Sequence, residues 1–121
     1  MKPIFVHDII REHIFKSLGM LRQKKPSLES LMKTEWSNTF EQLMRNRLIM
    51  GAIRYGLLKA PGKAKYNRIE SIRDRLDLYE ESDNAEHLVD IANLCLLEFE
   101  EPNHPNFHFE AADDAIHTKK L

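Results

Sequence analysis

The fold is decided by Leu88-Val89-Asp90-Ile91-Ala92-Asn93-Leu94-Cys95-Leu96-Leu97, the most apolar stretch of the 121-residue chain. A helix built from it carries apolar side chains on almost every side. Such a helix belongs at the centre of a bundle, because any face left in water would expose apolar surface. We therefore expect a central, mostly buried helix over about residues 85–100.

The rest of the chain also repeats apolar residues at helical spacing, and no segment alternates with the period of two that is typical of a strand. Capping residues mark three helix starts, at Ser27, at Thr39 with Gln42, and at Asn67 with Glu70. Besides the central helix, helices are expected over about residues 4–18, 28–36, 40–55 and 67–81, with a last short one near 110–117. The prediction is an all-α bundle of four to five helices.

The length of the chain favours a single helical domain over residues 1–121. Within it we expect an N-terminal helical segment (1–37), a bundle core (38–100) and an irregular tail with a short helix (101–121). No run of 18 apolar residues and no signal-peptide pattern is present, so no membrane association and a cytoplasmic location are expected.

Cysteine and histidine usage adds little chemistry. Cys95 is the only cysteine, which excludes a disulfide framework, and its apolar surroundings in sequence favour a core position. Three histidines near the C-terminus lack the i, i+4 spacing of a helical zinc pair, so we interpret His104, His108 and His117 as surface or packing residues.

Charge is divided sharply along the chain. Residues 1–68 carry a net charge of +9 and residues 69–121 a net charge of −10, although the whole chain is close to neutral. Either the halves neutralise each other, within one chain or across a symmetric interface, or a basic face stays free for an anion. We expect a homo-oligomer, and nucleic acid is an unlikely partner because no helix carries a dense Lys/Arg stripe.

The helix over 40–55 combines an apolar side with a basic one. Its apolar side is expected to bury Phe40, Leu43, Met44, Leu48 and Ile53. Its basic side places Arg47, Gly51 and Arg54 on one face, beside Tyr55 and ahead of a basic loop with Lys59 and Lys63. Guanidinium groups there favour phosphate, and the interior Gly51 indicates close approach of another backbone or of a ligand.

A polar line interrupts the central helix. Glu86, Asp90 and Asn93 share one face through their i, i+4, i+7 spacing. A carboxylate inside a bundle is costly unless it meets a cation, a donor or a metal. Two interpretations stay open: the line fixes helix register by bonding to a neighbouring helix, or it faces a cleft and holds Mg²⁺ against substrate phosphates.

Two short motifs carry a family resemblance. Gly51-Ala52-Ile53-Arg54-Tyr55-Gly56 is followed, about thirty residues later, by Glu86-His87-Leu88-Val89-Asp90-Ile91-Ala92-Asn93-Leu94. This pattern resembles small helical proteins of phages and mobile elements related to dATP/dGTP diphosphohydrolases, which are similar to MazG-like all-α NTP pyrophosphatases. The resemblance covers about residues 39–99. Those families release pyrophosphate from nucleoside triphosphates, using Mg²⁺ held by carboxylates of two helices.

The resemblance implies roles for individual residues. Glu86 and Asp90 would be the catalytic and metal carboxylates, with Asn93 supporting them and with Arg54 and Tyr55 near the nucleotide. MazG-like enzymes usually carry Glu-Glu-x-x-Glu on the first helix, where this chain offers Glu41 as the further metal carboxylate.

The leading prediction is a phage-type nucleotide-handling protein, with or without Mg²⁺-dependent pyrophosphohydrolase activity. Its nucleotide-binding residues would be Arg47, Arg54, Tyr55, Lys59, Lys63 and Asn93. The alternatives are a non-catalytic protein that sequesters a nucleotide signal and a helical protein–protein adaptor.

Overall fold

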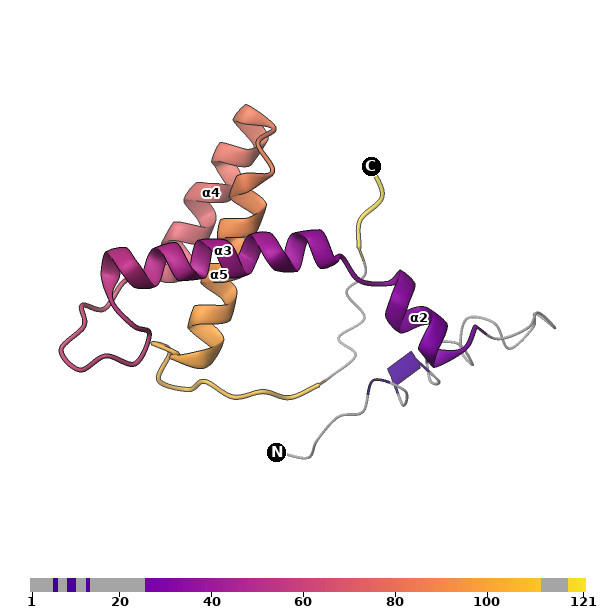
Figure 1. Cartoon of the computed structure of the whole chain (residues 1–121), viewed down its shortest axis with the longest axis horizontal. Coiled ribbons are helices and arrows are strands. Elements are labelled where there is room, and N and C mark those ends of the chain that lie inside the picture. The colour runs from indigo at the N-terminus through magenta and orange to yellow at the C-terminus, as the bar shows by residue number, and fades with distance from the viewer. Residues whose placement is uncertain (1–5, 7–8, 11–12, 14–25, 112–117) are drawn as a thin grey trace. The chain divides into compact units, whose positions relative to one another are not determined.

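The structure is a computed structural model that describes residues 6, 9–10, 13, 26–111 and 118–121 (Figure 1). The helices expected over 4–18 and 110–117 lie largely outside the described residues, as does His117. Over the part that is described, all regular secondary structure is helical and no strand occurs, so the prediction of an all-α fold is confirmed. No helix in that part is both long enough and apolar enough to cross a membrane.

The chain divides into two compact units, one over residues 37–107 and one formed by residues 1–36 and 108–121. The second unit contains the short helix α2 (Leu28–Thr34). As predicted, α2 is capped by Ser27, whose Oγ accepts a hydrogen bond from the Ser30 N–H at 3.1 Å. The expectation of one domain over the whole chain stays a prediction.

Three helices form the unit over residues 37–107: α3 (Asn38–Tyr55), α4 (Arg68–Ser82) and α5 (Glu86–Glu100). The α4 and α5 helices lie side by side as a hairpin, and α3 crosses α5 (Figure 1). Since α5 packs against both other helices, it is the central helix that the apolar stretch predicts.

Side-chain caps set the helix starts. α3 begins two residues earlier than expected, because its cap is Ser37 rather than Thr39, and the Ser37 side chain accepts a hydrogen bond from the Phe40 N–H. The predicted Asn67 cap is confirmed and bonds the Glu70 N–H at 3.1 Å. Asp83 adopts a left-handed conformation (φ 57°) that ends α4, and the Asn84 side chain then accepts from the first N–H of α5. These local devices close the α4–α5 hairpin.

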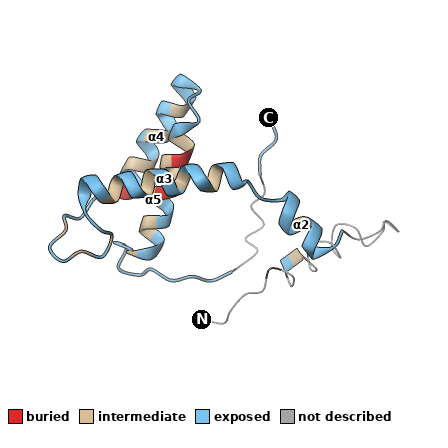
Figure 2. Ribbon diagram, in the orientation of Figure 1, coloured by how far each residue is buried: buried red, intermediate tan, exposed pale blue. Residues whose placement is uncertain are grey.

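The three-helix unit over residues 37–107, called the body below, buries fewer residues than the sequence predicts (Figure 2). In the described part of the chain Val89 is the one buried apolar residue, and on α5 only Val89 and Asn93 are buried. The core assignments of Cys95, Leu43 and Ile53 are wrong: all three are exposed, Ile53 to 80%. The physical reason on α3 is that this helix packs on α5 along one side, so its opposite side has no neighbour in the unit.

A buried arginine joins the start of α4 to the end of α5. Arg68 donates to the Glu98 carboxylate at 3.1 Å and to the Glu101 carbonyl at 2.7 Å. Asn103 completes the junction, because its N–H donates to Glu98 and its side chain donates to the Tyr66 carbonyl. These hydrogen bonds and ion pairs therefore tie the end of α5 to the start of α4 and to the loop that leads into it.

Candidate functional site

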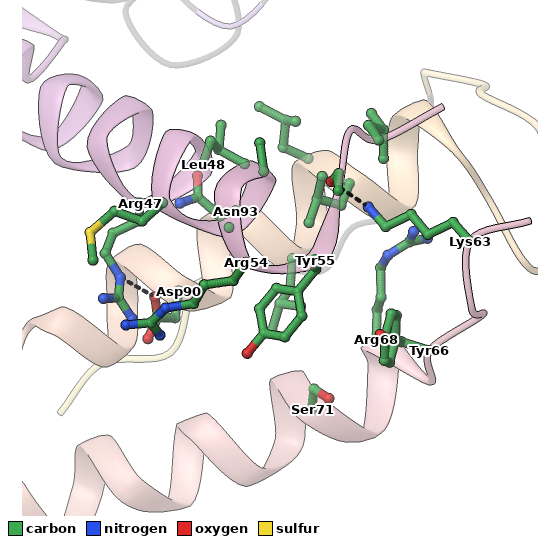
Figure 3. Close-up of a pocket in the computed structure, with 18 of the residues that line it drawn as sticks. Arg47, Leu48, Arg54, Tyr55, Lys63, Tyr66, Arg68, Ser71, Asp90 and Asn93 are labelled. Atoms are coloured by element: carbon green, nitrogen blue, oxygen red, sulfur yellow. Dashed lines mark hydrogen bonds and ion pairs between the residues drawn. The ribbon is translucent and has the colours of Figure 1, made fainter. Parts of the chain in front are cut away.

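A pocket of about 560 Å³ opens between α3, the loop that follows it, α4 and α5 (Figure 3). Pockets of this size suit small organic ligands. Basic residues dominate its polar lining, with Asp90 as the one carboxylate among the lining residues; the basic ones are Arg47, Arg54, Lys63, Arg68 and Arg75. A concave surface with this excess of positive charge attracts anions.

Asp90 neutralises part of that charge. Its Oδ1 lies 3.2 Å from Arg47 Nε (Figure 3), and its Oδ2 lies 3.8 Å from Arg75 Nε, so both oxygens face a guanidinium. Arg47 also contacts Glu86 Oε1 at 3.2 Å through Nη1. These pairs connect α5 to α3 on one side and to α4 on the other, as expected if the polar line of α5 fixes helix register.

Asn93 makes the second polar contact between α5 and α3. Its side chain is almost fully buried, and its Nδ2 donates to the Met44 carbonyl at 3.0 Å. Its Oδ1 has no hydrogen-bond partner among the described residues, although Asn93 lines the pocket. A buried acceptor without a donor is costly, so this oxygen would gain from a ligand N–H or O–H group.

Two cations of the pocket have no carboxylate partner among the described residues. The Arg54 side chain makes no hydrogen bond or ion pair with any of them, and it is exposed beside the opening. Lys63 donates to the backbone carbonyls of Gly56 and Leu57 at 3.2 and 3.4 Å, which ties the loop to the end of α3 but leaves the charge unbalanced. Arg54 and Lys63 are therefore the groups most available to an incoming anion.

The remaining wall is aromatic and apolar. Tyr55 at the end of α3 and Tyr66 before α4 meet edge to face, with ring centroids 6.4 Å apart. The Tyr55 ring appears between the Arg54 and Lys63 side chains in the view of Figure 3. Leucines from α5 and the loop complete this wall. The pocket thus combines cations for an anionic group with flat apolar surface for a ring.

Gly51 also lines the pocket, but the close backbone approach expected there is wrong. A Cβ placed on Gly51 would meet no atom within 4 Å outside its own helix backbone. The glycine therefore leaves open space on the pocket side of α3, and no neighbouring backbone requires it.

The predicted site residues divide into two groups. The pocket lining includes Arg47, Arg54, Tyr55, Lys63, Asp90 and Asn93. Lys59, Glu41 and Glu86 are outside this lining; Glu41 pairs with Arg45 at 3.1 Å, one turn along α3, and Glu86 pairs with Arg47.

The predicted carboxylates do not fit a magnesium ligand set in this arrangement. Asp90 and Glu86 both engage guanidinium groups, and Glu41 is directed to Arg45. Among the residues that the structure describes, no three His, Cys, Asp or Glu side chains gather as metal ligands. The magnesium assignment stays a prediction.

Sequence reasoning missed the contribution of α4. Arg68, Ser71 and Arg75 line the pocket from one face of this helix, and Tyr66 does so from the preceding loop. The signal was present as the i, i+3, i+7 spacing of the three helical residues, which places them on one side. Two of the three are arginines, which are usually exposed to solvent. From the sequence alone this face is therefore interpreted as solvent-exposed, because the positions of its acidic partners Asp90 and Glu98 are not known.

No protein-family model, curated protein or solved structure matches this chain.

Proposed function

We propose that the protein binds a nucleotide, with the phosphates held by Arg54 and Lys63 and the base or sugar against the Tyr55–Tyr66 wall. The observation that carries the proposal is that two cations without carboxylate partners in the described chain line the same pocket as an aromatic pair. An anion alone would not need the aromatic wall, and an apolar ligand would not need the cations.

The phosphate end depends on charge-assisted hydrogen bonds. A guanidinium offers a planar fork of donors that matches two phosphate oxygens, and an ammonium adds a compact point charge. Arg47 and Arg75 lie in the same lining but are shared with Asp90, so they contribute positive potential first and direct contacts second.

The other end of the pocket suits a ring that carries a donor group. Tyr55 and Tyr66 offer π surface on which a base can stack. The unpartnered Asn93 Oδ1 offers an acceptor for an amino or hydroxyl group. The resemblance of residues 39–99 to nucleotide hydrolases points to the same ligand class.

Binding is better supported than hydrolysis. A metal-activated water would need carboxylates free to hold the metal, whereas Glu86 and Asp90 are engaged by arginines. The proposed function is therefore a nucleotide-binding protein, as in the sequestering alternative, and turnover is an outcome for experiment to decide.

The test is thermal stabilisation by a panel of nucleoside mono-, di- and triphosphates, each with Mg²⁺ and with a chelator, followed by a pyrophosphate-release assay. At least one nucleotide should raise the melting temperature in the presence of the chelator. Arg54→Ala and Lys63→Ala should each weaken its binding about tenfold, the loss of one charge-assisted contact.

Two neighbouring cations serve as matched controls. Arg45 lies on α3 and Lys59 on the same loop as Lys63, but neither lines the pocket. Arg45→Ala and Lys59→Ala should change the affinity for the nucleotide by no more than about twofold, because each removes a positive charge that does not contact the nucleotide. Equal losses in all four variants would show a diffuse charge effect and would contradict the site.

A further inference from the structure

The outer side of α3 carries an apolar seam with no neighbour in its own unit. Leu43, Met50 and Ile53 are 46%, 42% and 80% exposed, and Ile49 beside them is 60% exposed. Monomeric proteins rarely leave a contiguous patch of large apolar side chains in water. We infer that this seam is where a second copy of the chain packs, α3 against α3.

The spacing of the seam residues is that of helices that pair. Leu43, Asn46, Met50 and Ile53 follow each other at intervals of three, four and three, the a/d pattern that keeps one stripe facing a partner helix. Most of this stripe points away from the side of α3 that packs on α5, where Met44, Arg47 and Leu48 are half-buried, and Met50 lies at the edge where it also lines the pocket. One helix thus presents two packing faces that meet at Met50.

The seam is also self-complementary. Its positions are symmetric about residue 48, so two antiparallel α3 helices related by a twofold axis would place Leu43 level with Ile53 of the second copy, and Asn46 level with Met50. A twofold interface requires the same surface patch on both copies to match itself. A seam with this symmetry matches itself without any further element.

Asn46 gives the seam a polar position. Its Oδ1 accepts from Gln42 Nε2 at 2.8 Å, which satisfies the amide oxygen within the helix. A polar residue among apolar seam positions costs stability. Because Asn46 would lie level with Met50 rather than with an amide of the second copy, it should weaken the pair.

The internal core of the body gives a reason to associate. Among the described residues Val89 is the only buried apolar one, whereas the four apolar residues of the seam region are each more than 40% exposed. With its polar rim, a pair of 18-residue helices would bury on the order of 1,000 Å² in total, the small end of specific interfaces. The dimer should accordingly dissociate on dilution.

The experiment is analytical ultracentrifugation of the full chain from about 1 to about 200 µM, a range that spans weak to moderate affinities. The weight-average mass should rise toward that of two chains. Ile53→Glu should weaken the dimer at least about tenfold. The matched control is Ile69→Glu on α4, where Ile69 is 47% exposed and away from the seam, and it should leave the dimer unchanged. Circular dichroism of both variants verifies that the helices remain.

Cross-linking tests the antiparallel register. In a Cys95→Ser background, Leu43→Cys combined with Ile53→Cys should form an intermolecular disulfide. Ile53→Cys alone should not, because the two copies of residue 53 would be about 15 Å apart along the paired helices. A monomer at every concentration, equal effects of the two glutamate variants, or efficient cross-linking of Ile53→Cys alone would overturn the inference. In the first case the face would be left to another occupant, such as the N-terminal helical segment (1–37).

Discussion

Arg47 Nε on α3 lies 3.2 Å from Asp90 Oδ1 on α5, at the wall of the basic pocket. Arg75 on α4 approaches the other oxygen of the same carboxylate at 3.8 Å. Asp90 thus acts as an internal anion that holds two guanidinium groups facing the pocket. A ligand phosphate entering there would compete with Asp90 for those groups, which gives this carboxylate a role opposite to that of a metal ligand.

The first prediction concerns this competition. Asp90→Asn should raise the affinity for the stabilising nucleotide by about tenfold, because it frees positive charge at the pocket wall. Isothermal titration in the presence of a chelator measures the change. Asp74→Asn is the control, since Asp74 is an exposed acid of α4 outside the pocket lining. A lower affinity for Asp90→Asn would instead favour a carboxylate that contributes to binding.

The second prediction concerns Gly51. Gly51→Ala should increase the free energy of unfolding by about 1 kcal/mol, because alanine is the better helix former and the new Cβ meets open space. Gly56→Ala is the contrasting change: Gly56 has φ 89°, where a side chain is strained, so this variant should lose about 1 kcal/mol. Urea unfolding of the three proteins measures both. Destabilisation by Gly51→Ala would show that an atom does approach this position.

The third prediction concerns the buried arginine. Arg68→Met should cost about 3 kcal/mol, because it removes the cation that neutralises Glu98 and the donor to the Glu101 carbonyl at a mostly buried junction. Arg73→Met, five residues further along α4, removes an exposed pair with Glu70 and should cost less than about 1 kcal/mol. Equal stability of the two variants in urea unfolding would contradict the structural role of the junction.

The fourth prediction follows from the charge state of Glu98. The Asn103 N–H, and then the Arg68 guanidinium, hold the pKa of Glu98 below its ordinary value of 4.5 against the opposing effect of burial. Because the folded protein binds this proton less readily than the unfolded chain does, the stabilisation is complete above the unfolded pKa and is lost as the pH falls through the lower folded pKa.

Glu98→Gln should therefore be less stable than the parent protein near neutral pH and should lose less stability between about pH 5 and about pH 3. Urea unfolding across that range measures the slope. Glu70→Gln is the control, because Glu70 pairs with Arg73 at an exposed site. Identical slopes for the parent and Glu98→Gln would rule out Glu98 as a source of acid sensitivity.

The sequence predicts the helices well because their signals are local. Ser27 and Asn67 cap helices through their own neighbours, and the apolar run at 88–97 needs no knowledge of the partner helices to be recognised as central. Burial is less predictable. Ile53 and Leu43 are apolar, but the residue type does not tell whether the same chain covers them, and both are exposed. The composition of α3 alone therefore does not distinguish its two sides.

The pocket was predicted in part for a similar reason. Arg47, Arg54 and Tyr55 follow from the face of one helix, and the polar line of α5 follows from its spacing. The pairing of Arg47 with Asp90 cannot be predicted in this way, because the two residues are 43 positions apart in the chain and meet only in the folded structure. Which cations remain available to a ligand depends on those tertiary pairs.

The most direct measurement is a calorimetric titration of the full chain with the nucleotide panel in the presence of a chelator, comparing the parent protein with Arg54→Ala and Lys63→Ala. The account predicts saturable binding of at least one nucleotide by the parent and about tenfold weaker binding by each variant. Absence of binding by every nucleotide, or binding that both variants retain in full, would contradict it.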